Sequence, residues 1–253
     1  MKNKIYFAVV IVLTAAIAAY CGYVFCIRSG IDGAGLEFLI PAYILSLVIS
    51  VFLCDLVHEG AHMLVGLCCS MGVKKPKYRL FKSSSVEVNP KGDRAMRARI
   101  FVTTAAGLFI NILLGAAGVI ALFVPGVPKV LCTVLPYSFY TIAINIAPME
   151  CSDGKTDGLV LWELITSQDS AKVMLAILKV QGAVNSGTNL QDVDENLLFD
   201  LPQLPEDDIN FIILTQLRYE YFLAKGNDSE ANKYFTRYKD LIKYLPSGYS
   251  DER

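Results

Sequence analysis

The sequence predicts an all-α polytopic membrane protein with about four transmembrane helices, a short β-hairpin-like segment and a small helical C-terminal domain. Two observations lead to this fold class. Of the 253 residues, 54% are hydrophobic, and the mean hydropathy of +0.44 is high for a soluble protein. Four apolar stretches also approach or exceed the roughly 20 residues that a helix needs to cross a bilayer. We expect the spans at residues 5–26, 38–70, 100–124 and 130–147.

The first apolar stretch, residues 5–26, is predicted to be a membrane helix that is not cleaved. It is longer than the roughly 7 to 15 residues of the apolar part of a signal peptide. No small-x-small cleavage site ends it. We therefore count it among the spans.

The loop 73–99 predicts the orientation of the chain, because it carries nine Lys or Arg residues against only Glu87 and Asp93. Positive loops stay in the cytoplasm, and an even number of spans then places both termini there too. Within the loop, residues 78–88 alternate apolar and polar side chains, which predicts a β-hairpin-like segment. The alternative is a solvated basic loop that contacts anionic lipid.

The chain from Leu159 onward has the character of a soluble protein, so we expect a transmembrane domain at 1–158 and a cytoplasmic helical domain at 159–253. Helical periodicity covers 159–180, and two further helices are predicted at 207–224 and 228–245. This last pair resembles a tetratricopeptide-type hairpin, although one pair does not define a repeat array. We expect a cytoplasmic protein partner to bind this domain.

A His58-Glu59-x-x-His62 pattern lies in the second apolar stretch and contains the only two histidines of the sequence. Residues four apart share a helix face, so His58 and His62 can reach one metal ion. Glu59 can hold a water molecule beside that metal without ligating it. Such short patterns also arise by accident, but ionisable clusters inside a membrane are costly and usually functional.

A third protein ligand must be a carboxylate or a thiolate, because no histidine remains. Two histidines and a carboxylate, with the fourth position left to water, form a common catalytic zinc shell. Pro148 interrupts the backbone where the fourth predicted span ends, and polar residues follow. This segment offers several candidate ligands, namely Glu150, Cys151, Asp153 and Asp157.

Two further polar residues in the predicted spans have two readings each. Asn111 lies between Gly107 and Gly115 at four-residue spacing, so it either bonds a neighbouring helix or offers its amide to the substrate backbone or the oxyanion. Asp55 lies one turn before Glu59 and either orients a metal ligand or lines a water path.

In this order, three motifs resemble those of the site-2 protease family of intramembrane zinc metalloproteases, over roughly residues 35–160. They are His58-Glu59-x-x-His62, Gly107-x-x-x-Asn111 and Asn145-x-x-Pro148-x-x-x-x-Asp153-Gly154. The resemblance implies one zinc ion (Zn2+) per chain. No sequence resembling a PDZ domain accompanies the motifs, so a small member of the family is expected.

The family resemblance also implies roles for individual residues. Asp153 would be the third zinc ligand beside His58 and His62, Glu59 the general base, and Asn145 the amide that positions the substrate or stabilises the oxyanion. A second Asp-Gly pair at Asp157 and Gly158 leaves the third ligand open between Asp153, Asp157 and Glu150.

These features predict a hydrolase, an intramembrane metalloprotease that cleaves a transmembrane or membrane-anchored protein near the cytoplasmic face. One alternative is a non-catalytic membrane scaffold or regulator that binds a partner through residues 159–253. Another is a different membrane zinc peptidase with Glu150 as ligand. The expected partners are the protein substrate and membrane lipid. The net charge of -1 gives no reason to expect binding to nucleic acid. We expect an integral protein of a bacterial cell membrane.

Overall fold

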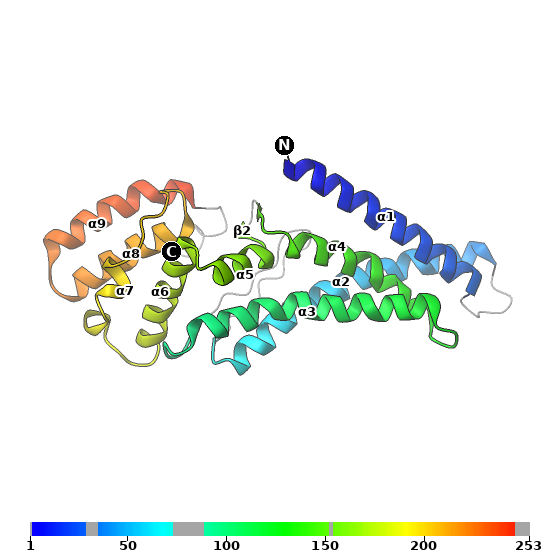
Figure 1. The fold of residues 1–253 in the computed structure, drawn as a ribbon, viewed down its shortest axis with the longest axis horizontal. Coiled ribbons are helices and arrows are strands. Elements are labelled where there is room, and N and C mark those ends of the chain that lie inside the picture. The colour runs from blue at the N-terminus through cyan, green and yellow to red at the C-terminus, as the bar shows by residue number, and fades with distance from the viewer. Residues whose placement is uncertain (1, 29–34, 73–88, 152–153, 246–253) are drawn as a thin grey trace. The chain divides into compact units, whose positions relative to one another are not determined.

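The computed structural model describes residues 2–28, 35–72, 89–151 and 154–245 (Figure 1). The hairpin predicted at 78–88 and the candidate ligand Asp153 lie outside these residues. Within the described ranges the chain is mostly α-helical, which confirms the α-helical part of the predicted fold class.

Four helical segments are long and apolar enough to cross a membrane, as predicted. The first three are α1 (Lys2–Arg28), α2 (Leu36–Cys68) and α3 (Met96–Phe123). The fourth, Lys129–Ile146, begins with the 3-10 helix η1 (Lys129–Thr133) and continues as α4 (Val134–Ile146). Pro136 explains this irregular start, because it lacks the N–H group that a regular helix would need there.

The chain divides into two compact units, which are described separately below. The first contains Met1–His62, Thr104–Met149 and Thr156–Gly158. The second contains Met63–Thr103, Glu150–Lys155 and Leu159–Arg253. The independence of the two domains predicted at 1–158 and 159–253 stays a prediction.

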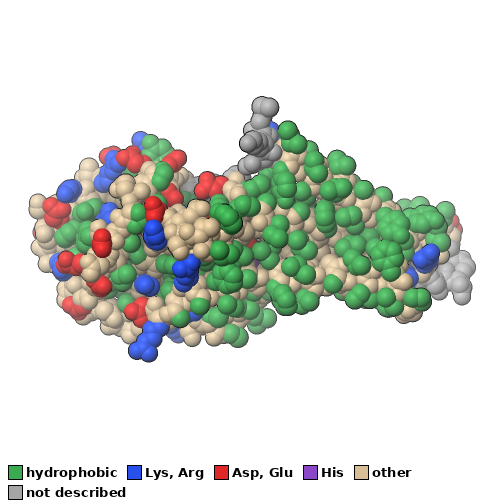
Figure 2. Space-filling model, viewed as in Figure 1, with side chains coloured by type: hydrophobic (Ala, Val, Ile, Leu, Met, Phe, Trp, Pro, Cys, Tyr) green, Lys and Arg blue, Asp and Glu red, His purple; other side chains and the backbone are tan. Residues whose placement is uncertain are grey.

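The first unit packs parts of α1 to α4 around a small apolar core. Hydrogen bonds between helices satisfy polar groups that lipid could not satisfy. The Tyr6 hydroxyl donates to the Ala143 carbonyl at 2.6 Å, and the Ser50 and Thr133 hydroxyls lie 2.7 Å apart. Figure 2 shows hydrophobic side chains over the outer surface of these helices, as expected for surfaces that face lipid. Buried core residues are Cys21, Val24, Phe25, Leu39, Tyr43, Ala121, Leu122 and Cys132.

The second unit has a short antiparallel strand pair, β1 (Glu150–Cys151) and β2 (Gly154–Lys155), that the sequence did not predict. Lys155 anchors it by donating to both carboxylate oxygens of the buried Glu163, at 2.8 and 2.9 Å. The same ammonium donates to the Ser170 hydroxyl at 2.7 Å. One side chain thus joins the strand pair to the two helices that follow.

The single helix predicted at 159–180 is two helices, α5 (Asp157–Thr166) and α6 (Asp169–Val184). Ser167 has a φ of 53°, in the left-handed region that ends a helix. The freed carbonyl groups of Leu164 and Ile165 accept hydrogen bonds from the Arg97 guanidinium. A contact distant in sequence therefore stabilises this break.

The two predicted helices at 207–224 and 228–245 are confirmed as α8 (Ile209–Ala224) and α9 (Asp228–Leu241). Asp208 and Asn227 cap their N-termini by accepting hydrogen bonds from the Asn210 and Glu230 backbone N–H groups. With α6 they enclose the main core of the second unit. Shorter elements complete this region, namely η2 (Leu190–Asp192), α7 (Asn196–Phe199) and η3 (Ile242–Tyr244).

Candidate metal centre

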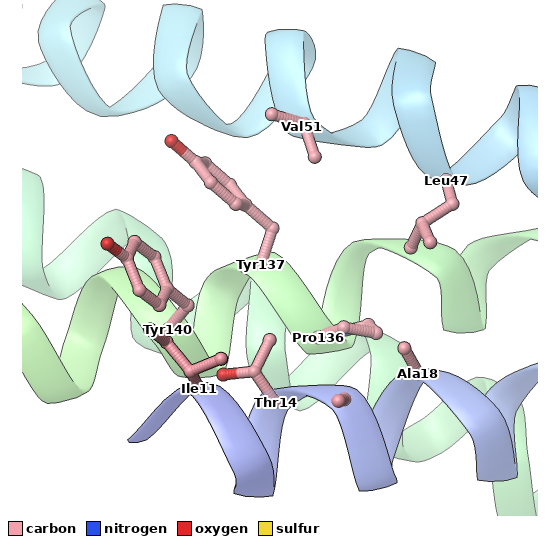
Figure 3. Close-up of a pocket in the computed structure, with 9 residues that line it drawn as sticks. Ile11, Thr14, Ala18, Leu47, Val51, Pro136, Tyr137 and Tyr140 are labelled. Atoms are coloured by element: carbon pink, nitrogen blue, oxygen red, sulfur yellow. The ribbon is translucent and has the colours of Figure 1, made fainter. Parts of the chain in front are cut away.

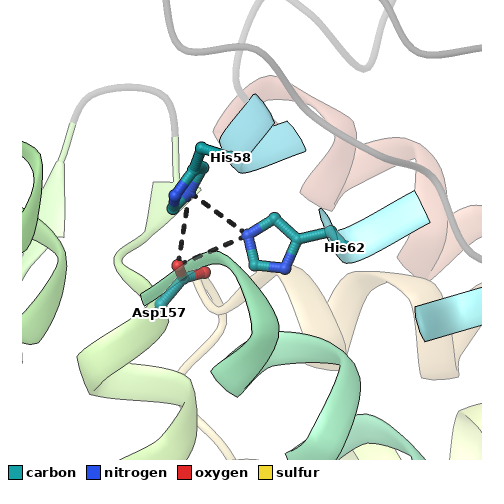
Figure 4. Close-up of side chains that lie close together, drawn as sticks. All are labelled: His58, His62 and Asp157. Atoms are coloured by element: carbon teal, nitrogen blue, oxygen red, sulfur yellow. Dashed lines mark hydrogen bonds and ion pairs between the residues drawn. The ribbon is translucent and has the colours of Figure 1, made fainter. Parts of the chain in front are cut away.

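Three side chains of the first unit converge on one point, His58 and His62 from α2 and Asp157 from the start of α5 (Figure 4). The two Nε2 atoms lie 3.2 Å apart. Asp157 Oδ2 lies 3.5 Å from His58 Nε2 and 3.4 Å from His62 Nε2. Neighbouring ligand atoms around a tetrahedral zinc ion, with bonds of roughly 2.0 to 2.2 Å, lie about 3.3 to 3.4 Å apart. The three atoms therefore fit three corners of such a shell.

The hydrogen bonding of Asp157 also fits a metal ligand. Its Oδ2 atom is buried and has no hydrogen-bond partner among the described residues. A buried carboxylate oxygen left in this state carries a large desolvation cost. A cation between the two imidazoles and this oxygen would remove that cost.

The segment after α4 folds back so that Asp157 faces α2. The buried Thr156 hydroxyl donates to the Ala147 carbonyl at 2.6 Å, and its backbone N–H donates to the Met149 carbonyl at 3.1 Å. On the other side, Gly158 lies against the carbonyl groups of Asn145 and Ile146, where a Cβ would overlap the backbone. Thr156 and Gly158 thus fix Asp157 to the end of α4.

Gly107 on α3 leaves the space that the two imidazoles occupy. A Cβ at this position would overlap His62 Nε2 and lie only 2.6 Å from His58 Cε1. By contrast, a Cβ at Gly115, two turns along the same helix, would make ordinary contacts at 3.7 Å. Gly107 therefore belongs to the site, whereas Gly115 only lines a helix contact.

Asn111 bonds a metal-site histidine from the next turn of α3. It is fully buried, and its amide nitrogen lies 2.8 Å from His58 Nδ1, while its Oδ1 atom has no partner among the described residues. Rotating an amide by 180° exchanges its oxygen and nitrogen at little steric cost. In the rotated form Oδ1 accepts from His58 Nδ1–H, which leaves the Nε2 lone pair free to ligate a metal.

Glu59, the predicted general base, is buried beside His58 on α2. Asp55 lies one turn earlier on the same helix. Glu59 is thus an acidic neighbour of His58 that does not belong to the group formed by His58, His62 and Asp157.

An apolar cavity of about 360 Å³ lies in the first unit among α1, α2 and α4 (Figure 3). Leu47 and Val51 line it from α2, and Tyr137 lines it from α4. Leu47 and Val51 continue towards Asp55 and Glu59 as one row along α2, with one residue per turn. This row places the cavity along the same side of α2 that carries Asp55 and Glu59.

The structure thus brings together two of the three expected ligands, His58 and His62, with Asp157 as the third. The ligand role of Asp153 stays a prediction. Glu150 and Cys151 are exposed in β1 of the second unit. Within the described ranges, no further group of three His, Cys, Asp or Glu side chains converges in this way.

Asn145, predicted to contact substrate, lies half-buried in the last turn of α4. Among the described residues its side chain has no hydrogen-bond partner, so the amide is free to bind a ligand. Its backbone carbonyl lies beside Gly158, next to Asp157.

The sequence contained one signal for Asp157. The periodic apolar run 159–165 follows an Asp-Gly pair, and acidic residues are favoured in the first turn of a helix. A predicted helix start at residue 157 would have placed the Asp157 carboxylate in the first turn of a helix rather than in a loop.

No protein-family model, curated protein or solved structure matches the chain, so the geometry of His58, His62 and Asp157 carries the assignment of a candidate metal centre.

Proposed function

We propose that this chain is a zinc-dependent peptidase of the membrane that hydrolyses a peptide bond in a membrane-anchored protein. The observation that carries the proposal is the convergence of His58, His62 and Asp157 beside the buried Glu59. Bound to these three ligands, zinc would act as a Lewis acid and lower the pKa of a bound water to about 7.

The ligand set and the sequence pattern together favour zinc. Imidazole also suits iron, copper and nickel, and two histidines with a carboxylate bind iron in some oxygenases. The glutamate next to the first histidine is typical of zinc peptidases, in which it serves as the base. Zinc is therefore the metal to test first.

Glu59 would act as the proton carrier of the reaction. Its carboxylate takes a proton from the attacking water and delivers it to the nitrogen of the departing amine. Its place directly after His58 on α2 favours this role, because a base beside the metal ligands can reach a water bound between them.

The position of the site supports a substrate that comes from the membrane. His58 and Glu59 lie in the 33-residue apolar helix α2, and the apolar cavity beside Val51 and Tyr137 would accept hydrophobic residues of the substrate. A peptide bond within a helix is shielded by its own hydrogen bonds, so the substrate must be extended where it is cut. The free amide of Asn145 would bind that extended backbone.

Replacing Glu59 with Gln tests the proposal directly. We expect the E59Q variant to keep one zinc per chain and to lose cleavage of a single-span reporter protein by about 100-fold or more. Zinc content and reporter cleavage are measured in parallel on the wild type and the variant. The proposal fails if the two proteins cleave equally, or if zinc-loaded wild type cleaves none of a panel of single-span reporters. The second result would favour a membrane scaffold with a structural metal.

A further inference from the structure

A cleft of about 820 Å³ lies in the second unit, and none of the residues that line it belongs to the metal centre. Its apolar wall comes from three helices, with Phe101 and Val102 from α3, Ile165 from α5 and Leu175 from α6. Phe101, Val102 and Ile165 are exposed. The cleft thus offers open apolar surface that the described residues of this unit do not cover.

Two cations line the same cleft. Lys179 on α6 is half-buried, and among the described residues its ammonium group has no hydrogen-bond or ion-pair partner. Arg97 on α3 donates to the Leu164 and Ile165 carbonyls and to the Ser167 hydroxyl, which are all uncharged. Among the described residues no carboxylate pairs with Arg97, so the cleft suits an anion that also has apolar parts.

The cleft lies where a span reaches its polar end. Arg97 is in the first turn of α3, and the apolar sequence of this candidate span follows it. On α5, Trp162 and Ile165 are exposed and share a face, because they are three residues apart. An exposed tryptophan beside apolar and basic residues is typical of the boundary between membrane and water.

We propose that this cleft binds an anionic phospholipid of the surrounding bilayer. The lipid phosphate would pair with Lys179 and Arg97, and its acyl chains would cover Phe101, Val102 and Ile165. A free phosphate would leave the apolar wall exposed, and a zwitterionic lipid would bring its own cation close to the two basic residues. The open apolar wall together with two uncompensated charges favours the anionic lipid.

Trp162 provides a probe for this site, because it is the only tryptophan in the sequence. The full chain in detergent is titrated with brominated phosphatidylglycerol or with brominated phosphatidylcholine of the same chain length. Bromine quenches tryptophan fluorescence only at short range. We expect phosphatidylglycerol to reach half-maximal quenching at an about fivefold lower mole fraction, the effect of one cation near an anionic phosphate.

Substitution of Lys179 tests the residue assignment. The K179Q variant should lose the preference for phosphatidylglycerol, and the K179R variant should retain it. K172Q is the matched control, because Lys172 lies on the same helix but is exposed and pairs with Asp169 at 2.7 Å.

Several outcomes would overturn the proposal. Equal quenching by the two lipids in the wild type excludes a site for anionic lipid near Trp162. A preference that survives in K179Q places the site elsewhere. Displacement of phosphatidylglycerol by inorganic phosphate would assign the cleft to a soluble anion. If K179Q fails to fold, the wild-type titration and the retained preference of K179R still decide the question.

Discussion

At the scale of single residues, the identity of the proposed third metal ligand can be tested directly. Asp153 and Asp157 are both candidates, because each precedes a glycine. The structure places Asp157 within 3.5 Å of both histidine Nε2 atoms. We predict that D157A loses zinc during dialysis, whereas D153A retains close to one zinc per chain. Metal analysis of the two purified variants measures this. The opposite pattern would assign the third position to Asp153, as the family resemblance implies.

Asn111 is predicted to act on the metal through His58 rather than on the substrate. N111L keeps the approximate shape of the side chain but cannot accept the hydrogen bond from His58 Nδ1–H. Zinc affinity should therefore fall by about 10- to 100-fold, the usual effect of losing such a partner. Competition with a chelator measures the affinity.

Two comparisons separate this positioning role from general damage. N111D can still accept the hydrogen bond and should restore most of the zinc affinity. N145L removes the other candidate amide, at the end of α4, and should leave zinc affinity unchanged. Wild-type affinity in N111L would show that His58 does not depend on Asn111.

At the scale of helices, two glycines of α3 differ in how closely they lie against neighbouring side chains. We predict that G107A lowers zinc binding strongly, because the new Cβ would displace both imidazoles. G115A adds the same methyl group on the same helix at ordinary contact distance and should bind zinc normally. Circular dichroism checks that both variants stay helical. Equal zinc content in the two variants would contradict this account of the site.

The helices show what sequence patterns can and cannot predict. Hydropathy predicted the four candidate spans, because length and apolar composition alone define a candidate. It did not predict the break between α5 and α6 at Ser167, since serine carries no strong local preference for a left-handed conformation. That break is stabilised by Arg97, about 70 residues away, through the Leu164 and Ile165 carbonyls.

At the scale of the whole molecule, the sequence predicted the part of the candidate site that lies on α2. His58, Glu59 and His62 follow from one local pattern on one helix, so their proximity needed no tertiary information. The third ligand depends on how the chain folds after Pro148, which the hydrogen bonds of Thr156 decide. Periodicity and spacing therefore could not decide which of the two Asp-Gly pairs, four residues apart, supplies the third ligand.

Under the proposed function, zinc removal should destabilise the first unit, because the proposed ligands His58, His62 and Asp157 connect α2 to the start of α5. We predict that a chelator lowers the Tm of the wild type and that added zinc restores it, as expected for a ligand that binds only the folded state. D157A should already melt at the lower temperature and respond little to chelator. An unchanged wild-type Tm after confirmed zinc removal would contradict this link between metal and fold.

The position of Asp157 in the chain also bears on how the protein is made. About 95 residues separate it from His62, and the third and fourth candidate spans lie between them. During synthesis the two histidines therefore emerge long before their carboxylate partner. The three side chains can come together only after the fourth candidate span and Asp157 have left the ribosome, so an unfinished chain would carry no complete candidate metal centre.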